Sequence, residues 1–151
     1  MIDRYKYSSI NRFPVLLRGA WFGMNRVFRE RLKNLGITTS QYTALRCLHE
    51  NEGINQSVLS KRISTNKNNC SALVNRLRKQ GLIQKEVIID DRRNYNLNLT
   101  KKGKEIFSKA DDIACDLQKE VLGELPLNAE TALVSLLRKI EMTLSEKFQI
   151  H

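Results

Sequence analysis

Residues 54–100 read INQSVLSKRISTNKNNCSALVNRLRKQGLIQKEVIIDDRRNYNLNLT, and they contain the most informative local patterns of the chain. Asn55 and Asn66 each stand before a short segment whose apolar residues are three or four positions apart. An asparagine at such a place caps a helix, because its side-chain oxygen accepts hydrogen bonds from the free N–H groups of the first turn. Gly81 fits the end of the second segment, where glycine adopts a left-handed conformation at little cost. The pattern predicts two short helices joined by a tight turn.

The residues after Gly81 have the pattern of a β-hairpin. Isoleucine and valine are frequent over residues 83–89, and apolar residues alternate with asparagines over residues 94–99. Between these segments, Asp90-Asp91-Arg92-Arg93 predicts a turn with two arginines at its tip. Two helices followed by a basic hairpin form a winged helix-turn-helix. In that arrangement the second helix suits the major groove of DNA, and the tip reaches an adjacent minor groove or the backbone.

Further motifs lie on both sides of this stretch. In chain order they are Leu35-Gly36-Ile37-Thr38 followed by Gln41, Arg76-Leu77 with Gly81-Leu82, Asp91-Arg92-Arg93, and Leu99-Thr100-Lys101-Lys102-Gly103. The ordered set resembles the MarR family, the multiple-antibiotic-resistance regulators. The resemblance implies a winged helix-turn-helix that binds DNA and regulates transcription, and repression is the expected mode.

We therefore expect a mainly α-helical protein with a small β-hairpin wing, forming a single domain over residues 1–151. The DNA-binding core is expected over residues 36–100, between helices in 10–35 and 101–151. Each flanking segment carries a complete apolar stripe, and such a stripe needs a partner. It can pack on its own chain, but the resemblance implies that the chain ends interleave with those of a second subunit. A homodimer would place its second helices about 34 Å apart and bind a pseudo-palindromic, inverted-repeat operator.

The positive charge is concentrated on the expected DNA-binding stretch. The chain has a formal net charge of +10. Residues 1–60 contribute +5, residues 61–104 contribute +9 from twelve basic and three acidic residues, and residues 105–151 contribute −4. This asymmetry indicates a polyanionic partner, which we take to be double-stranded DNA.

Individual DNA contacts follow from position on the second helix and the hairpin. Asparagine can bond adenine through two hydrogen bonds, and lysine can reach guanine. The residues near the start of the helix are predicted to face bases, although a phosphate contact or a capping role is an alternative for each: Lys67, Asn68, Asn69 and Ser71. Three residues further along are predicted to contact phosphates: Asn75, Arg76 and Lys79. By resemblance Arg93 enters the minor groove, and Arg92 then contacts the backbone or solvent. As an alternative to its phosphate contact, Arg76 can pair with Asp91, which would support the wing.

The resemblance also implies a small aromatic or phenolic ligand, such as an aromatic acid, in a cleft between the dimerisation helices and the winged core. Five residues could line it: Arg18, Trp21, Tyr42, Arg46 and His49. Trp21 lies three positions after Arg18, and Arg46 four after Tyr42, so each pair shares a helical face. Core packing of the aromatic residues and solvation of the arginines are the alternatives.

The cysteines raise a second possibility, a redox-responsive regulator. Cys47, Cys70 and Cys115 form no CxxC pair, so neither a disulfide framework nor a zinc site is indicated. Free cysteine is usually a small buried hydrophobe. Cys70 lies near the start of the second helix, where a helix N-terminus would lower the pKa of its thiol.

Catalysis is not expected. The only histidines are His49 and His151, and Cys47 lies two positions from His49, so these two side chains point to different faces of a helix. No phosphate loop, metal-ligand set or cofactor motif is present. A non-specific, architectural DNA-binding protein remains an alternative, because lysine and arginine alone supply affinity for DNA. With no signal peptide and no apolar run of about eighteen residues, we expect a soluble cytoplasmic protein without membrane partners.

Overall fold

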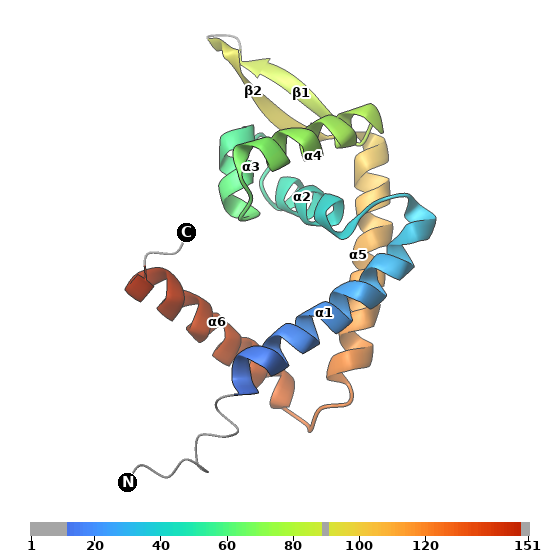
Figure 1. Cartoon of the computed structure of the whole chain (residues 1–151). Coiled ribbons are helices and arrows are strands. Elements are labelled where there is room, and N and C mark those ends of the chain that lie inside the picture. Colours follow the sequence, from blue (N-terminus) through green and yellow to red (C-terminus); the bar gives the residue numbers. More distant parts are fainter. Residues whose placement is uncertain (1–11, 89–90, 149–151) are drawn as a thin grey trace.

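The structure, a computed structural model, describes residues 12–88 and 91–148, and the side chains of residues 88, 91–94 and 148 are not included in that description. In Figure 1, α2, α3, α4 and the hairpin form one lobe, while α1 and α5 extend from it and α6 turns back from the far end of α5. The elements are α1 (Phe13–Leu32), the 3₁₀ helix η2 (Lys33–Leu35), α2 (Thr39–Glu50), α3 (Gln56–Arg62), α4 (Lys67–Lys79), β1 (Ile83–Ile88), β2 (Asp91–Leu99), α5 (Lys101–Leu122) and α6 (Ala129–Phe148). The prediction of a mainly helical winged fold is confirmed.

The first helix is shorter than the sequence predicts. A helix is expected from residue 10, which lies outside the described residues, to Leu35. The α-helix instead begins at Phe13, with Pro14 in its first turn, where the missing N–H costs no hydrogen bond. Its end tightens into η2, and Gly36 stops it at φ 66°. Among the described residues, none lies close to Gly19 or Gly23, so packing within this part of the chain does not explain the two glycines.

The core joins α2 to the helix-turn-helix. A threonine followed three positions later by glutamine predicts a capping box at Thr38 and Gln41. The box is present, with hydrogen bonds of 2.9 and 3.2 Å, and α2 begins at Thr39. Gln41 also donates from Nε2 to Oε1 of Gln80 at the end of α4, at 2.6 Å. Fully buried leucines form the centre of this core, and burial of each contributes about 1.5–3 kcal/mol. They are Leu32, Leu45, Leu48, Leu59, Leu77 and Leu97.

The hairpin is antiparallel, and its register places the basic tip. Ile83 pairs with Leu99 and Val87 with Tyr95, but Ile88 pairs with Asp91. Residues 92–94 therefore form a bulge on β2, with no partners on β1. The predicted turn over residues 90–93 is wrong in this respect, because pairing of Asp91 brings residues 91–93 into the strand. Residues 89 and 90 lie outside the description.

The α5 helix packs through a face offset from the predicted one. Apolar spacing predicts a stripe of Ile106, Ala110, Ile113, Leu117 and Val121. In the structure Phe107, Ala110 and Ala114 are buried with Leu117, whereas Val121 is 41% exposed. The sequence also predicts Thr100 as the cap of this helix, and its side chain accepts from the backbone N–H of Gly103 at 3.0 Å. Gly103 is buried where α5 passes β1: an added Cβ would lie 1.9 Å from the carbonyl oxygen of Leu82.

Apolar side chains remain open on α1 and α6. On α1, Trp21 is 59% exposed, and on α6 Leu136 is 63% exposed. Other exposed apolar residues on these helices are Phe13, Val15, Leu16, Leu17, Phe22, Val27, Leu133, Val134, Leu137, Met142 and Leu144. None of the described helices is both long and apolar enough to cross a bilayer. The chain's own core thus leaves two apolar helices uncovered.

Candidate nucleic-acid interface

Helix α4 has one buried side and one polar side. Asn66 caps it, accepting from the N–H of Asn69 at 2.8 Å. Cys70, Val74 and Leu77 are fully buried against the core. The predicted Asn55 cap of α3 is also present, at 2.9 Å from the N–H of Val58, although Val58 itself is 36% exposed and lies outside the core. The two caps and the turn between them fix which face of α4 points outward.

The outward face carries the predicted DNA contacts. Lys67, Asn68 and Asn69 are exposed at the start of α4, and Ser71 is half-buried. Asn75, Arg76 and Lys79 are exposed along its second half. No acidic residue occurs in α4. These side chains can therefore donate hydrogen bonds to bases and phosphates without an internal competitor on their own helix.

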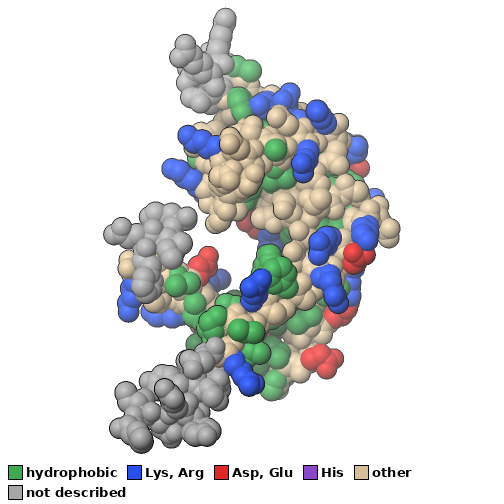
Figure 2. Space-filling view, in the orientation of Figure 1, with side chains coloured by type: hydrophobic (Ala, Val, Ile, Leu, Met, Phe, Trp, Pro, Cys, Tyr) green, Lys and Arg blue, Asp and Glu red, His purple; other side chains and the backbone are tan. Residues whose placement is uncertain are grey.

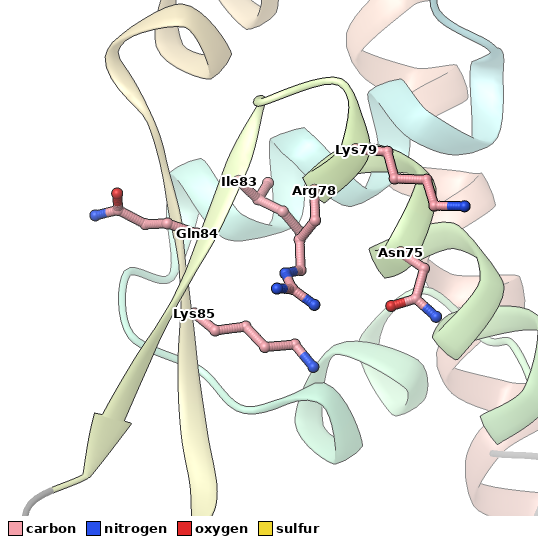
Figure 3. Close-up of a pocket in the computed structure, with 6 residues that line it drawn as sticks. All are labelled: Asn75, Arg78, Lys79, Ile83, Gln84 and Lys85. Atoms are coloured by element: carbon pink, nitrogen blue, oxygen red, sulfur yellow. The ribbon is translucent and has the colours of Figure 1, made fainter.

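A basic cavity lies between the second half of α4 and strand β1. Its volume is about 690 Å³, and it is lined by Asn75, Arg78, Lys79, Ile83, Gln84 and Lys85. Figure 3 shows Arg78 and Asn75 from α4 and Lys85 from β1 extending toward one another, while Gln84 extends to the other side of the strand. The cavity lining has no carboxylate.

Lys85 is held in place by an aromatic ring of the wing. Its Nζ lies 3.7 Å from the ring centroid of Tyr95, which is within the range of a cation–π interaction. The Tyr95 hydroxyl donates to Oε1 of Gln56, the first residue of α3, at 2.8 Å. This chain of contacts connects both strands of the wing to the helix-turn-helix.

The backbone of β2 carries the residues of the wing tip. Arg92 and Arg93 belong to the bulge in the backbone of β2, and their side chains, like that of Asp91, lie outside the described residues. The predicted pairing of Asp91 with Arg76 therefore stays a prediction. Figure 2 shows Lys and Arg side chains spread over the lobe that contains the hairpin and α4, with few acidic side chains among them.

Comparison with known proteins agrees with this geometry. Residues 37–95 match the sequence model of the MarR family. The chain is 28% identical over 107 residues to the transcriptional regulator HosA of Escherichia coli O157:H7, covering 71% of this chain and 79% of HosA. The chain is thus similar to regulators of the MarR family in sequence over residues 37–95 and in fold. It is a DNA-binding transcriptional regulator, and its relatives are not enzymes.

Solved MarR-family structures share the fold. A mutant MarR from E. coli complexed with operator DNA superimposes with a TM-score of 0.79 at 23% identity, covering 89% of this chain and 96% of that one. BpsR of Bordetella bronchiseptica, whose DNA binding is regulated by 6-hydroxynicotinic acid, gives 0.78 at 22% identity, covering 86% and 98%. The expected fold class is thus confirmed by known members of the MarR family.

A second, smaller cavity lies where a MarR-family ligand was predicted. It measures about 210 Å³ and is lined by Trp21, Met24, Asn25, Phe28, Tyr42, Arg46, Ala114, Leu117 and Gln118. Of the predicted residues, Trp21, Tyr42 and Arg46 meet here. Arg18 and His49 do not line this cavity. Arg18 lies 5.2 Å over the ring of Phe22, and the His49 ring lies 4.6 Å from that of Phe107.

Burial changes the expectation for Cys70. A low thiol pKa is expected at a helix start, yet Cys70 is fully buried, and this burial raises the pKa of its thiol. Burial likewise raises the pKa of Cys47. Cys115 is exposed on α5. A raised pKa lowers the thiolate fraction, so neither buried cysteine has the character of a redox sensor.

Within the described ranges, no group of side chains is arranged to hold a metal.

The cavity on α4 adds residues that the sequence did not single out. The sequence pattern indicates a role for neither Arg78, which is adjacent to Lys79, nor Lys85, which falls within a predicted strand. A usable signal was available: Lys85 has the same parity as the buried Ile83, so alternation places both on the strand face that packs against α4.

Proposed function

We propose that this protein is a homodimeric repressor of the MarR family that binds an inverted-repeat operator and is released by a small aromatic or phenolic ligand. The observation that carries the proposal is the outward face of α4. It combines uncharged donors at the helix start, Asn68 and Asn69, with cations further along and no carboxylate. Uncharged donors suit base edges, whereas cations suit phosphates.

Dimerisation is supported by the open apolar helices. Leu136 is 63% exposed, and exposure of an apolar side chain to water is unfavourable. A second surface that covers Leu136 would remove this cost. Figure 1 shows α6 separated from the winged lobe, at the far end of α5. A second copy offers the same two apolar helices, so a two-fold interface would cover both sets at once.

Ligand control is supported by the cavity at Tyr42. A cavity of about 150 Å³ is large enough for benzene, so the 210 Å³ here suits a compact aromatic molecule. Trp21, Phe28 and Tyr42 supply aromatic walls, and Arg46 supplies a cation for an acidic or phenolic group. The cavity lies between α1, α2 and α5, so a ligand could alter how the winged core sits on the flanking helices. The regulation of BpsR by 6-hydroxynicotinic acid supports this class of ligand.

Sedimentation tests the dimer. We expect about twice the 17.5 kDa chain mass for the wild type and a shift to monomer for Leu136→Glu. Val87→Glu is the matched control, since Val87 is 64% exposed but lies on the wing. A wild-type monomer at micromolar concentration would remove both the dimer and the inverted repeat from the proposal.

Selection of genomic fragments by the purified protein tests the operator. We expect the recovered fragments to share an inverted repeat, and the neighbouring genes to suggest the ligand. The competing function is a non-specific architectural DNA-binding protein, favoured by the +9 charge of residues 61–104. Competition by random duplex separates the two: equal affinity for selected and random DNA would favour the architectural function.

A further inference from the structure

The basic cavity lies where a strand of the DNA backbone would pass if a winged helix bound DNA. Adjacent major and minor grooves are separated by one sugar–phosphate backbone. If α4 occupies the major groove and the hairpin tip reaches the adjacent minor groove, that backbone must pass between α4 and the hairpin. The space between them is the cavity lined by Arg78 and Lys85.

The two cations come from different elements and face the same space. Arg78 is exposed on α4, and Lys85 is half-buried on β1. Among the side chains that the structure describes, no carboxylate pairs with either. Glu86, the next residue of the strand, lies with Gln84 on the opposite face, where the two side chains are 3.3 Å apart. Both cations therefore retain their donors for an external anion.

We propose that Arg78 and Lys85 form a clamp for a single phosphodiester of the DNA backbone. This inference rests on the proposed DNA-binding mode and assigns two further residues to it. Arg78 supplies a planar fork that matches two phosphate oxygens, and Lys85 supplies a point charge from the other side. Asn75 adds a neutral donor at the cavity wall.

Tyr95 is the positioning residue of this clamp. Its ring holds the Lys85 ammonium at 3.7 Å, and its hydroxyl is fixed to Gln56 at 2.8 Å. A lysine has a long flexible chain, so holding its head group before DNA arrives reduces the entropy lost on binding. The contact leaves the ammonium hydrogens on the far side from the ring available to phosphate.

Salt titrations on operator and random duplex test the clamp. Arg78→Ala and Lys85→Ala should each weaken both complexes about five- to tenfold and leave the ratio of the two affinities unchanged, because a phosphate carries no sequence information. The double variant should lose about 0.9 of the salt slope per bound protomer, the value for one phosphate. Lys119→Ala, which removes an exposed charge at the far end of α5, is the control and should keep the wild-type slope.

Neutral DNA analogues identify the phosphate itself. Single methylphosphonate groups, which lack the phosphate charge, are introduced along the operator. At one position per half-site the wild type should lose about as much affinity as the double variant does, and the double variant should lose nothing more. If no position shows this coupling, or if the double variant loses twice the slope expected for one phosphate, the shared clamp is overturned.

Variants of Tyr95 test the positioning role. Tyr95→Phe keeps the ring and should bind nearly as the wild type, whereas Tyr95→Leu should reproduce part of the Lys85→Ala loss in salt slope. Equal slopes for both Tyr95 variants would contradict the role.

Inorganic phosphate, added at constant ionic strength, should compete only weakly; strong competition that is lost in the double variant would reassign the cavity to a free anion. A wild type that prefers no sequence would instead contradict the proposed repressor function while leaving the clamp testable on random duplex.

Discussion

The hydroxyl of Tyr42 on α2 donates a 2.8 Å hydrogen bond to Oδ1 of Asp111 on α5. Arg46 donates from Nη1 to the same hydroxyl at 3.2 Å. Tyr42 is 7% exposed, and its ring packs nearly perpendicular to that of Phe28, with the two centroids 4.9 Å apart. Burial, with help from the bond to Asp111, raises the pKa of Tyr42 to about 12. One tyrosine thus joins two helices at the wall of the proposed ligand cavity.

The raised pKa predicts a loss of stability at high pH. Between the ordinary pKa of 10 and the folded value of about 12, the folded state binds more protons than the unfolded state, so the free energy of unfolding falls as pH rises. The contribution is complete below pH 10. Urea unfolding at about pH 9 and about pH 11 measures it. We expect the fall to be smaller in Tyr42→Phe than in the wild type and unchanged in Tyr95→Phe; an equal fall in all three proteins would contradict the assignment.

Gly103 should tolerate no side chain. An added Cβ would lie 1.9 Å from the carbonyl oxygen of Leu82 and 2.9 Å from its carbonyl carbon, and backbone atoms cannot move aside cheaply. We expect Gly103→Ala to lower the free energy of unfolding by about 3 kcal/mol, the upper range for overpacking. Ser108→Ala, at an exposed position of the same helix, should change it by less than about 0.5 kcal/mol. Thermal or urea unfolding of both variants decides the matter, and a neutral Gly103→Ala would contradict the close approach.

The local signals in the sequence predicted the fold well where one residue decides the structure. The caps at Thr38, Asn55, Asn66 and Thr100 are all present, because each satisfies N–H groups of its own first turn. Glycine likewise ends the helices where expected, with Gly81 at φ 71°. These features depend on residues only a few positions apart, so they can be predicted without knowledge of tertiary contacts.

Features that depend on distant contacts were predicted less well. The apolar spacing of α5 suits two adjacent faces, and only the positions of α1 and α2 decide that Phe107 and Ala114 face the core. The bulge on β2 depends on which residue pairs with Ile88. The cavity at Arg78 and Lys85 depends on the distance between α4 and a strand that follows it. Composition and charge indicate a DNA-binding surface but not its shape.

Arg93→Ala tests the wing. The backbone of β2 carries Arg93 in the bulge beside the hairpin tip. If the arginine enters the minor groove, its removal should weaken operator binding about tenfold and reduce the salt slope by about one per protomer. The measurement is a salt titration on the selected operator, with thermal unfolding to show an intact fold. Arg92→Ala is the neighbouring control and should have the smaller effect; wild-type affinity in Arg93→Ala would exclude Arg93 from the interface.

The last prediction separates base recognition from phosphate binding on α4. Asn68 and Asn69 are exposed and uncharged, so they add little to the general attraction for DNA. If one of them bonds adenine through two hydrogen bonds, its alanine variant should lose about 1–3 kcal/mol on the operator. It should lose almost nothing on random duplex, whose affinity comes from cations that neutralise phosphates. Lys79→Ala should lower both affinities by similar factors, because a phosphate contact is independent of sequence.

Paired titrations of operator and random duplex measure the ratio of the two affinities for each variant. We expect this ratio to fall for Asn68→Ala or Asn69→Ala and to hold for Lys79→Ala. The Asn69 backbone N–H already serves the cap of Asn66, but its side chain is not needed for that bond, so alanine there should leave the helix intact. If both asparagine variants keep the wild-type ratio, base recognition depends on other residues at the start of α4. Lys67 and Ser71 then become the candidates, since they are the remaining side-chain donors there.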